Sequence, residues 1–363
     1  MKLTLIAGAR PNFMKIASVV DAIDKARTNG QHIEYRLVHT GQHYDRNMSD
    51  SFFKELGIPE PHVNLECGGG TQAEQTANIM VKFEKDLMAN PTDIVLVVGD
   101  VTSTLACSIV AKKLCTDVAH VEAGIRSGDL TMPEEINRMV TDSITDVFFT
   151  TSHKANDNLK RAGVPVDRIH FVGNTMIDTL LKNRPRFVKP AIYDAAQLQP
   201  QGYFVLTLHR PANVDEEQQL VHMLETILTS ANGLPVIFPV HPRTAQKLRS
   251  RQITATNLHM VEPLSYLQFN YLVQHAKGVI TDSGGITEET TVMNVPCITL
   301  RNSTERPETV DIGTNELIGT DPSALPPYME KLFRGEWKKG SIPELWDGKT
   351  GERIIKILAN LYS

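Results

Sequence analysis

Three carboxylates stand where a parallel sheet would place them at one edge. Asp100 follows an apolar run at 93–98, Glu122 follows a second run at 117–121, and Glu134 stands at an expected helix start. Open α/β folds bind ligands at the carboxyl ends of their strands, so we expect the three side chains to converge. Carboxylates that lie close together shift one another's pKa apart, which gives one site both an acid and a base.

Two of the carboxylates also have a structural interpretation. Asp100 can cap the helix expected to begin near Thr102, because a short polar side chain accepts hydrogen bonds from free N–H groups there. Glu134 and its neighbour Glu135 follow Pro133, and the helix dipole favours acidic residues in a first turn. The interpretation as a reactive site therefore depends on the whole set rather than on any one member.

Two glycine-containing segments predict turns that bind anions. GARPNFMK, at 8–15, follows the first expected strand and opens a helix, with Arg10 and Lys15 adding positive charge. TDSGGITEE, at 281–289, repeats this arrangement in the second half of the chain. Backbone N–H groups at the start of a helix favour phosphate. The alternatives are a plain strand-to-helix turn for the first segment and a glycine-rich loop without function for the second.

The second turn suits a nucleotide diphosphate. The amides of Ser283, Gly284 and Gly285 can surround the diphosphate, while Glu289, one turn into the helix, can accept hydrogen bonds from ribose hydroxyls. Arg306 in RNSTERPE supplies positive charge from the next loop. The chain contains no GxGxxG or Walker sequence, so neither a dinucleotide fold nor an NTPase gains support.

Two histidines follow successive expected strands of the second half. His209 and Arg210 lie in LTLHRPANVD, and His241 begins HPRT. A single histidine is more often a hydrogen-bonded structural residue, but two at equivalent strand ends favour a function. No metal site is expected, because the sequence has neither HExxH nor clustered His and Cys residues.

Alternating short apolar runs and longer helical patterns must position these residues. In the first half we expect strands at 3–7, 32–39, 93–98, 117–121 and 147–150, and helices at 13–29, 46–56, 71–88, 102–114, 133–144 and 154–162. In the second half we expect strands at 203–208, 235–240, 259–261, 278–281 and 297–300, and helices at 216–230, 243–249, 265–275 and 285–293. This alternation predicts an α/β fold with parallel sheets covered by helices on both faces.

The chain length and one proline-containing segment predict two domains. The 363 residues suggest two domains, and the segment 182–202, with three prolines, is the expected linker. A last helix, expected at 351–362, belongs to neither series by position.

Composition excludes several classes of protein. Lys plus Arg number 37 against 42 for Asp plus Glu, a net charge of -5 without a basic run, so no nucleic-acid partner is expected. No apolar stretch approaches the ~18 residues of a membrane span, and the apolar start is too short for a signal peptide. The four cysteines form no CxxC pair, which is typical of reduced thiols in a cytoplasmic protein.

Ten ordered segments, spread over nearly the whole chain, resemble those of non-hydrolysing UDP-N-acetylglucosamine 2-epimerases. They are GARPNFMK, TGQH, GDVTSTLA, HVEAGIRSGD, MPEEINR, GNTMIDTL, LTLHRPANVD, HPRT, TDSGGITEE and TERPE. The resemblance implies a GT-B-like fold, with two Rossmann-like doubly wound parallel-sheet domains facing a central cleft. The implied domains are 1–175, with the C-terminal helix 351–363 packing back on it, and 176–350, which binds UDP. It also implies a homodimer that needs no cofactor or metal.

The resemblance assigns roles to single residues. Asp100, Glu122, Glu134 and His209 match the family's catalytic set. The expected substrate-binding residues are Arg10, Lys15, Arg210, His241, Leu264, Phe269, Ser283, Gly284, Gly285, Glu289 and Arg306, of which Phe269 matches the residue that packs on uracil. Asn12 is a departure, because many members have Glu at this position.

The implied reaction interconverts UDP-N-acetylglucosamine and UDP-N-acetylmannosamine, for surface polysaccharide precursors, by elimination of UDP and its re-addition. GARPNF, GQHYDRNMS and the GGG run also resemble a sister branch that acts on UDP-2,3-diacetamido-2,3-dideoxyglucuronic acid. A glycosyltransferase of the same fold is a rival, although three carboxylates exceed what transfer demands. A hydrolysing epimerase and a non-catalytic nucleotide-sugar sensor are the remaining alternatives.

Overall fold

The computed structural model describes residues 1–41, 53, 55–209, 217–240, 248 and 255–362, although not the side chains of Arg10 and Glu217. The chain divides into two compact units. Unit 1 comprises Met1–Lys182 and Glu344–Ser363, and unit 2 comprises Asn183–Pro343. Among the described residues, no helix is both long enough and apolar enough to cross a membrane.

Unit 1 is built on a seven-stranded parallel sheet in the order β3-β2-β1-β4-β5-β6-β7. Its strands are β1 (Lys2–Ala7), β2 (Glu34–His39), β3 (Val63–Asn64), β4 (Ile94–Val98), β5 (Asp117–Val121), β6 (Val147–Thr150) and β7 (Ile169–Phe171). Every residue of β4 is buried, as expected of a central strand covered on both faces. The sequence did not predict β3 and β7, which are too short to show an alternating pattern.

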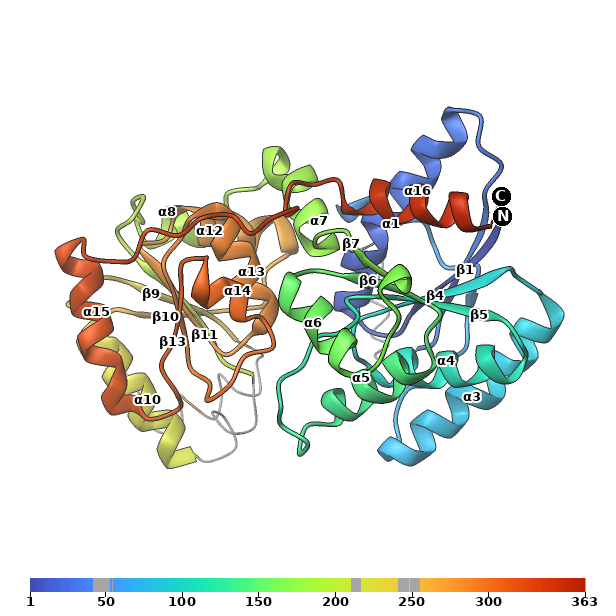
Figure 1. Cartoon of the computed structure of the whole chain (residues 1–363). Helices are drawn as coiled ribbons and strands as arrows, with labels where there is room; N and C mark the ends of the chain where they lie inside the picture. Colours follow the sequence, from blue (N-terminus) through green and yellow to red (C-terminus); the bar gives the residue numbers. More distant parts are fainter. Residues whose placement is uncertain (42–52, 54, 210–216, 241–247, 249–254, 363) are drawn as a thin grey trace. The chain divides into compact units, whose positions relative to one another are not determined.

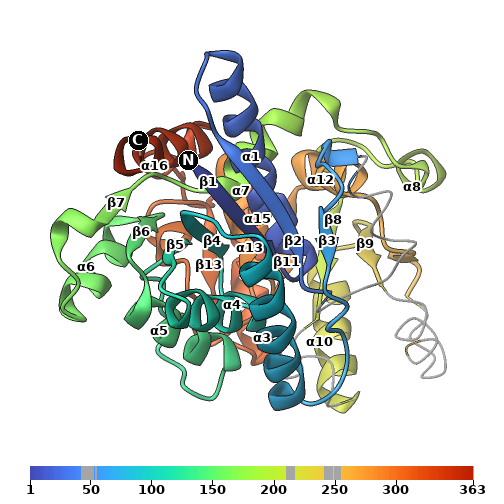
Figure 2. The ribbon, with the colours of Figure 1, turned by 90° about the vertical axis from the view of Figure 1, so that its right-hand side faces the viewer.

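Helices cover both faces of this sheet. They are α1 (Arg10–Thr28), α3 (Gln72–Ala89), α4 (Thr102–Lys113), α5 (Pro133–Ile144), α6 (His153–Arg161), α7 (Thr175–Asn183) and α16 (Thr350–Leu361), with a 3-10 turn at Val166–Arg168. Figures 1 and 2 show α3, α4 and α5 on one face and α1, α7 and α16 on the other. The helix expected at 46–56 falls mainly outside the described residues.

Helix α16 packs closely on α1, although the two helices stand at opposite ends of the chain. A β-carbon on Gly351 would lie 2.3 Å from the Ser18 carbonyl oxygen, so only glycine permits this approach. The Gly351 N–H donates to Asp178 Oδ2 at 2.8 Å, which ties α16 to α7 as well. The first turn of α16 therefore packs on α1 and α7, which lie near the two ends of the Met1–Lys182 segment.

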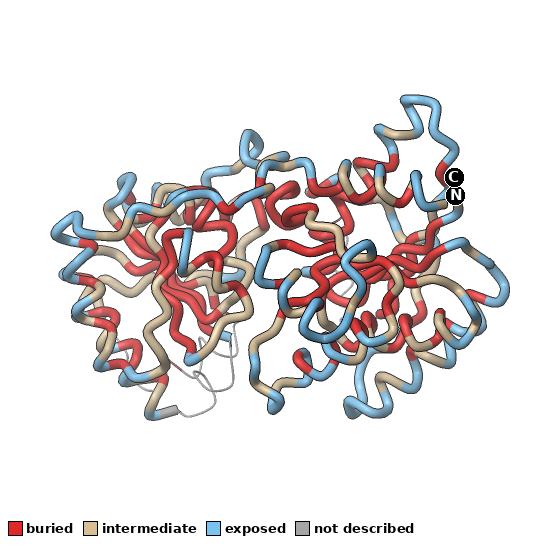
Figure 3. The backbone as a smooth tube through the Cα atoms, viewed as in Figure 1, coloured by how far each residue is buried: buried red, intermediate tan, exposed pale blue. Residues whose placement is uncertain are grey.

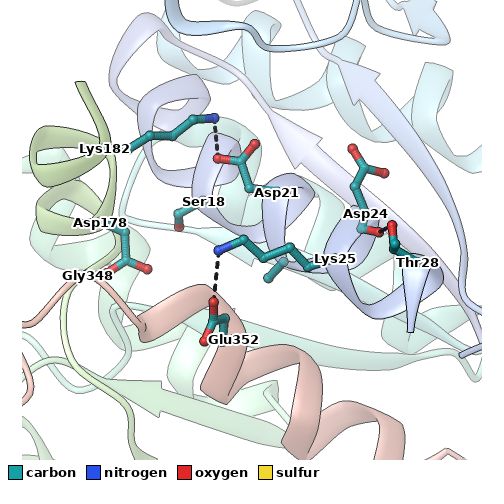
Figure 4. Close-up of a pocket in the computed structure, with 10 residues that line it drawn as sticks. Ser18, Asp21, Asp24, Lys25, Thr28, Asp178, Lys182, Gly348 and Glu352 are labelled. Carbon is teal, nitrogen blue, oxygen red and sulfur yellow. Dashed lines mark hydrogen bonds and ion pairs between the residues drawn. The ribbon is translucent and has the colours of Figure 1, made fainter. Parts of the chain in front are cut away.

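A polar hollow of about 470 Å³ lies among these three helices (Figure 4). Two ion pairs cross it: Lys182 to Asp21 at 2.5 Å and Lys25 to Glu352 at 2.9 Å. None of the candidate site residues lines it. The hollow therefore belongs to the packing of α1, α7 and α16 rather than to the predicted chemistry.

Unit 2 is built on a six-stranded parallel sheet in the order β10-β9-β8-β11-β12-β13. The strands are β8 (Phe204–Thr207), β9 (Val236–Pro239), β10 (Leu258–Val261), β11 (Gly278–Thr281), β12 (Cys297–Thr299) and β13 (Asn315–Leu317). Its helices are α8 (Ala191–Ala195), α10 (Glu217–Ser230), α12 (Tyr266–His275), α13 (Gly284–Met293), α14 (Pro307–Asp311) and α15 (Leu325–Arg334), with 3-10 turns at Arg184–Arg186 and Pro322–Ala324. The helix expected at 243–249 lies mainly outside the described residues. Both sheets form buried bands in Figure 3.

The segment expected to link the halves is folded onto unit 2. The Val188 N–H donates to the Leu267 carbonyl, and the Tyr193 ring packs edge-on against Tyr203 and Tyr271. Aromatic burial thus gives most of this proline-containing stretch a fixed place, which its composition did not predict.

Candidate active site

A buried ion pair joins the first helix of unit 1 to the end of β5. Lys15 Nζ lies 2.8 Å from Glu122 Oε2, and the two side chains are only 11% and 3% exposed. The neighbouring Gly99 permits this arrangement, because a β-carbon there would lie 3.0 Å from Lys15 Nζ. Glu122 itself has a φ of 71°, a left-handed conformation that a residue with a side chain rarely adopts. Backbone strain of this kind is concentrated at functional sites.

Asp100, just beyond β4, is held by an arginine that sequence reasoning missed. Arg138 donates to Asp100 Oδ2 from Nε at 3.0 Å and from Nη2 at 2.5 Å. Asn137 Nδ2 also donates to the Asp100 carbonyl at 2.8 Å. Asp100 is therefore anchored to α5 by two side chains, while its carboxylate stays 29% exposed. The only sequence signal for Arg138 was its place in MPEEINR.

The adjacent acids Glu134 and Glu135 differ sharply in surroundings. Glu135 is buried, accepts hydrogen bonds from the N–H groups of Ser127 and Gly128, and pairs with Arg138 Nη1 at 2.7 Å. Burial alone would raise the pKa of Glu135, but these donors together hold it below its ordinary value. Glu134 is exposed in the same first turn of α5. Glu135 is thus structural, while Glu134 is open to a ligand.

Asn12, the departure from the family pattern, braces the first turn of α1. Its Oδ1 accepts hydrogen bonds from the N–H groups of Gly8 and Ala9, and its Nδ2 donates to the Val98 carbonyl at 3.1 Å. The side chain therefore connects the strand-to-helix turn after β1 with the end of β4. Arg10 is the first residue of α1, and its side chain lies outside the described part.

In unit 2, the buried carboxylate of Asp282 positions the backbone of His209, which lies two residues beyond β8. Both oxygens of Asp282 accept hydrogen bonds from the His209 N–H, at 3.1 and 2.9 Å, and Asp282 is fully buried. The His209 imidazole is 67% exposed, with Nδ1 3.6 Å from Asp282 Oδ1. The ring is thus near a fixed negative charge and still accessible. Arg210 and His241 lie outside the described residues.

The N-terminus of α13 has the form expected of an anion-binding turn. Ser283 stands at the helix cap, and Gly284 and Gly285 open the first turn. Within the described part of the chain, the Ser283 side chain makes no capping hydrogen bond to this turn. The positive end of the helix dipole and these N–H groups together favour a phosphate.

Two arginines follow this turn, each beside an acid. Arg306 pairs with Glu288 of α13 at 2.5 Å, and Arg301 pairs with Glu305 at 2.6 Å. The positive charge of Arg306 is thus partly balanced by α13 itself. Sequence reasoning did not select Arg301, because its spacing alone does not distinguish it from a surface charge.

Glu289 is buried one turn into α13. Tyr266 donates its hydroxyl to Glu289 Oε1 at 2.8 Å. Burial raises the pKa of Glu289 to about 7, against the opposing effect of hydrogen bonds from Tyr266 and Asn270. Phe269, also on α12, and Leu264, just before it, are half-buried. One helix therefore supplies both the partner of Glu289 and the aromatic residue expected at a base.

The chain is similar to one family of nucleotide-sugar enzymes throughout its length. A sequence model of the UDP-N-acetylglucosamine 2-epimerase family matches residues 25–359. The UDP-N-acetylglucosamine 2-epimerase of Methanocaldococcus jannaschii is 40% identical over 371 residues, covering 99% of each chain. The UDP-2,3-diacetamido-2,3-dideoxy-D-glucuronate 2-epimerase of Pseudomonas aeruginosa is 39% identical over 322 residues, covering 88% of each.

Solved structures agree with these similarities. The crystal structure of the Methanocaldococcus jannaschii UDP-GlcNAc 2-epimerase with UDP-GlcNAc and UDP has a TM-score of 0.87 to this chain at 39% identity, covering 99% of this chain and 100% of that one. The Neisseria meningitidis UDP-GlcNAc 2-epimerase bound to UDP-GlcNAc has a TM-score of 0.88 at 28% identity, covering 99% and 100%. The expected GT-B-like class of two parallel-sheet α/β domains is confirmed.

Proposed function

Because the chain belongs to the UDP-N-acetylglucosamine 2-epimerase family, we propose that it interconverts UDP-N-acetylglucosamine and UDP-N-acetylmannosamine. Members of this family are isomerases of nucleotide sugars. The observation that carries the assignment for this chain is the group of charged residues beyond β4 and β5. There, Lys15 pairs with Glu122 and Arg138 holds Asp100.

The reaction inverts carbon 2 of the sugar, whose hydrogen is barely acidic because no carbonyl stands next to the carbon. Breaking the bond between carbon 1 and the diphosphate oxygen makes carbon 1 cation-like and acidifies that hydrogen. Loss of the proton to a base then gives 2-acetamidoglucal and free UDP. In the return step the diphosphate oxygen adds to carbon 1, and an acid protonates carbon 2 on the opposite face. One base and one acid are therefore required.

We assign this proton transfer to Asp100, Glu122 and Glu134 of unit 1. Asp100 and Glu122 are held in place by Arg138 and Lys15. Glu134 is exposed and accessible to a substrate. Lys15 and Arg10, both on α1 of unit 1, would supply the positive charge.

We assign the nucleotide to unit 2. The N–H groups of Ser283, Gly284 and Gly285 would hold the diphosphate and stabilise the negative charge that it gains on leaving. Glu289 would accept hydrogen bonds from the ribose hydroxyls. Phe269 and Leu264 would contact the uracil, and Arg306, His209, Arg210 and His241 would complete the polar contacts.

The sister-branch substrate is the second candidate, because a diacetamidoglucuronate 2-epimerase is 39% identical to this chain. The experiment is a proton NMR assay with each sugar nucleotide and no added cofactor. We expect UDP-N-acetylglucosamine to be epimerised without net release of UDP. Turnover of the diacetamidoglucuronate alone would favour the sister branch. Stoichiometric release of UDP with free N-acetylmannosamine would identify a hydrolysing enzyme.

The setting of the enzyme is also a proposal. We infer a homodimer that works in the cytoplasm and supplies a precursor of surface polysaccharide. The family resemblance supports the dimer and the role in polysaccharide synthesis, and the free cysteines support the cytoplasm. Light scattering at micromolar concentration tests the oligomeric state, since a mass near twice 40.3 kDa is expected.

A further inference from the structure

The ring of His120, in the middle of unit 1, lies between two hydrogen-bond acceptors. His120 Nδ1 is 2.8 Å from Asp142 Oδ1, and its Nε2 is 2.8 Å from the Gly99 carbonyl oxygen. The His120 residue is fully buried on β5, and Asp142 of α5 is only 4% exposed. This pair lies outside the set of residues to which the reaction was assigned above.

Both ring nitrogens of His120 are engaged, one by each acceptor. A carbonyl oxygen can only accept, so Nε2 donates to Gly99. Burial would raise the pKa of Asp142, but the hydrogen bond with His120 and the Arg126 guanidinium hold it below its ordinary value. The ring therefore extends from the Gly99 carbonyl to a carboxylate that also pairs with Arg126.

The same pair connects the two loops that carry candidate catalytic carboxylates. Gly99 immediately precedes Asp100, so the bond from Nε2 holds the turn in which Asp100 stands. The other oxygen of Asp142 accepts from the Gly124 N–H at 3.1 Å and from Arg126 Nη1 at 2.6 Å, in the loop that follows Glu122. The buried pair of His120 and Asp142 thus joins both loops to the same helix.

We propose that His120, held between Asp142 and the Gly99 carbonyl, is a positioning residue that sets the Asp100 turn relative to the Glu122 loop. The inference rests on the proposed function, since it gives Asp100 and Glu122 their roles in the reaction. The ring reaches both acceptors at once, and both contacts are buried away from water. The expected consequence of losing this bridge is misplacement of a carboxylate, for which a shift near 1 Å can cost about 100-fold in rate.

The bridge can be observed in the intact wild-type protein. We use histidine labelled with ¹⁵N, record long-range proton–nitrogen spectra, and assign the His120 signals by their loss in His120→Asn. We expect the Nε2 proton of His120 to exchange slowly with water, because it is buried and donated to the Gly99 carbonyl. The exposed ring of His209 is the internal reference for fast exchange. A His120 proton that exchanges as fast as this reference would overturn the proposal.

The positioning role is tested by kinetics per folded molecule. His120→Asn, which cannot reach Gly99 and still donate to Asp142, should lower kcat by ~10 to 100-fold. The KM should change by less than about threefold, since no substrate contact is removed. His170→Gln is the matched control, because this half-buried histidine on β7 stacks on Phe149 and makes no side-chain hydrogen bond in the described structure. We expect the control to keep its kcat even if its melting temperature falls.

Rescue by an isosteric variant separates positioning from simple stability. In Asp142→Asn the amide can donate to His120 Nδ1 and still accept from Gly124, so both loops stay connected. We expect it to keep kcat within about threefold of wild type, whereas Asp142→Ala should lose activity as His120→Asn does. Equal kcat in His120→Asn and wild type would overturn the proposal. If wild-type protein fails to epimerise any UDP-sugar, the proposed function fails, while the slowly exchanging His120 proton still reports the bridge.

Discussion

Lys15 Nζ and Glu122 Oε2 lie 2.8 Å apart, although the two residues are 107 positions apart in the chain. The pair joins α1, the helix after β1, to the left-handed residue just beyond β5. An ion pair so well shielded from water stabilises the fold only while both partners are present, because either charge alone would be buried without compensation. The same pairing fixes the position of the Glu122 carboxylate, as a base at carbon 2 would require.

Removing one member of this pair should therefore cost more than removing both. We expect Lys15→Met to lower the free energy of unfolding by about 3–5 kcal/mol. The double variant Lys15→Met with Glu122→Gln should recover a large part of that loss. Urea denaturation of both single variants and the double variant gives the coupling energy. If the losses of unfolding free energy in the two single variants simply add up in the double variant, Lys15 and Glu122 have no measurable mutual interaction.

The carboxylates should separate into catalytic and structural members. Asp100→Asn, Glu122→Gln and Glu134→Gln should each lower turnover by at least ~100-fold, the usual range for a positioned acid or base. UDP affinity should change little in all three. Steady-state kinetics and calorimetry with UDP measure the two effects separately.

Glu135→Gln is the matched control for Glu134→Gln, because the two acids are neighbours in one helix turn. Glu135 is buried among backbone donors and Arg138, so its variant should lose stability while activity per folded molecule persists. Glu134 is exposed, so its variant should melt near the wild-type temperature. If the two variants exchange these behaviours, Glu135 and not Glu134 is the member of the catalytic set.

The affinity for UDP should depend on pH through Glu289. Burial raises its pKa to about 7, so the carboxyl is largely protonated below pH 6 and ionised above pH 8. Ribose hydroxyls donate best to the ionised form, and affinity should therefore rise as the pH passes upward through 7. UDP titrates as well, so the quantity to compare is the difference between wild type and Glu289→Gln, measured by calorimetry at pH 6, 7 and 8. A difference that stays constant over this range would exclude a titrating Glu289 at the nucleotide.

A second pH dependence concerns stability and comes from Asp178, the carboxylate that holds α16. Burial raises its pKa to about 6, against the opposing bond from Gly351, so the folded state binds this proton more tightly than the unfolded chain. The stabilising contribution is complete below about pH 4 and is lost as the pH rises through 6. Asp178→Asn removes this titration and should gain in melting temperature relative to wild type between pH 5 and 8. If the difference in melting temperature between Asp178→Asn and wild type were the same at pH 5 and at pH 8, the assignment would be contradicted.

Much of this arrangement could be predicted from sequence, because the alternation of strands and helices and the strand ends follow from periodicity. The continuous apolar run of β4 and the turn before α13 are signals that depend on neighbouring residues alone. The partners of the site residues could not be predicted in the same way. Arg138 and Tyr266 are unremarkable within their helices, and only tertiary packing brings them to Asp100 and Glu289.

Short edge elements were also beyond the sequence signal. Strands β3, β7 and β13 have two or three residues each, too few for an alternating pattern, and pairing with a longer neighbour is what orders them. The segment 182–202 was expected to be a linker from its prolines. Aromatic contacts of Tyr193 place it on unit 2 instead, and composition carries no information about such contacts.

The central claim is that this chain inverts carbon 2 by removing and returning a proton. The most direct measurement is proton NMR of UDP-N-acetylglucosamine with the enzyme in deuterated water, without metal or nicotinamide cofactor. We predict that the UDP-N-acetylmannosamine formed carries deuterium at carbon 2, that the remaining substrate acquires it as equilibrium is reached, and that Asp100→Asn shows neither change over the same period. Epimerised product that retains protium at carbon 2 would contradict the account.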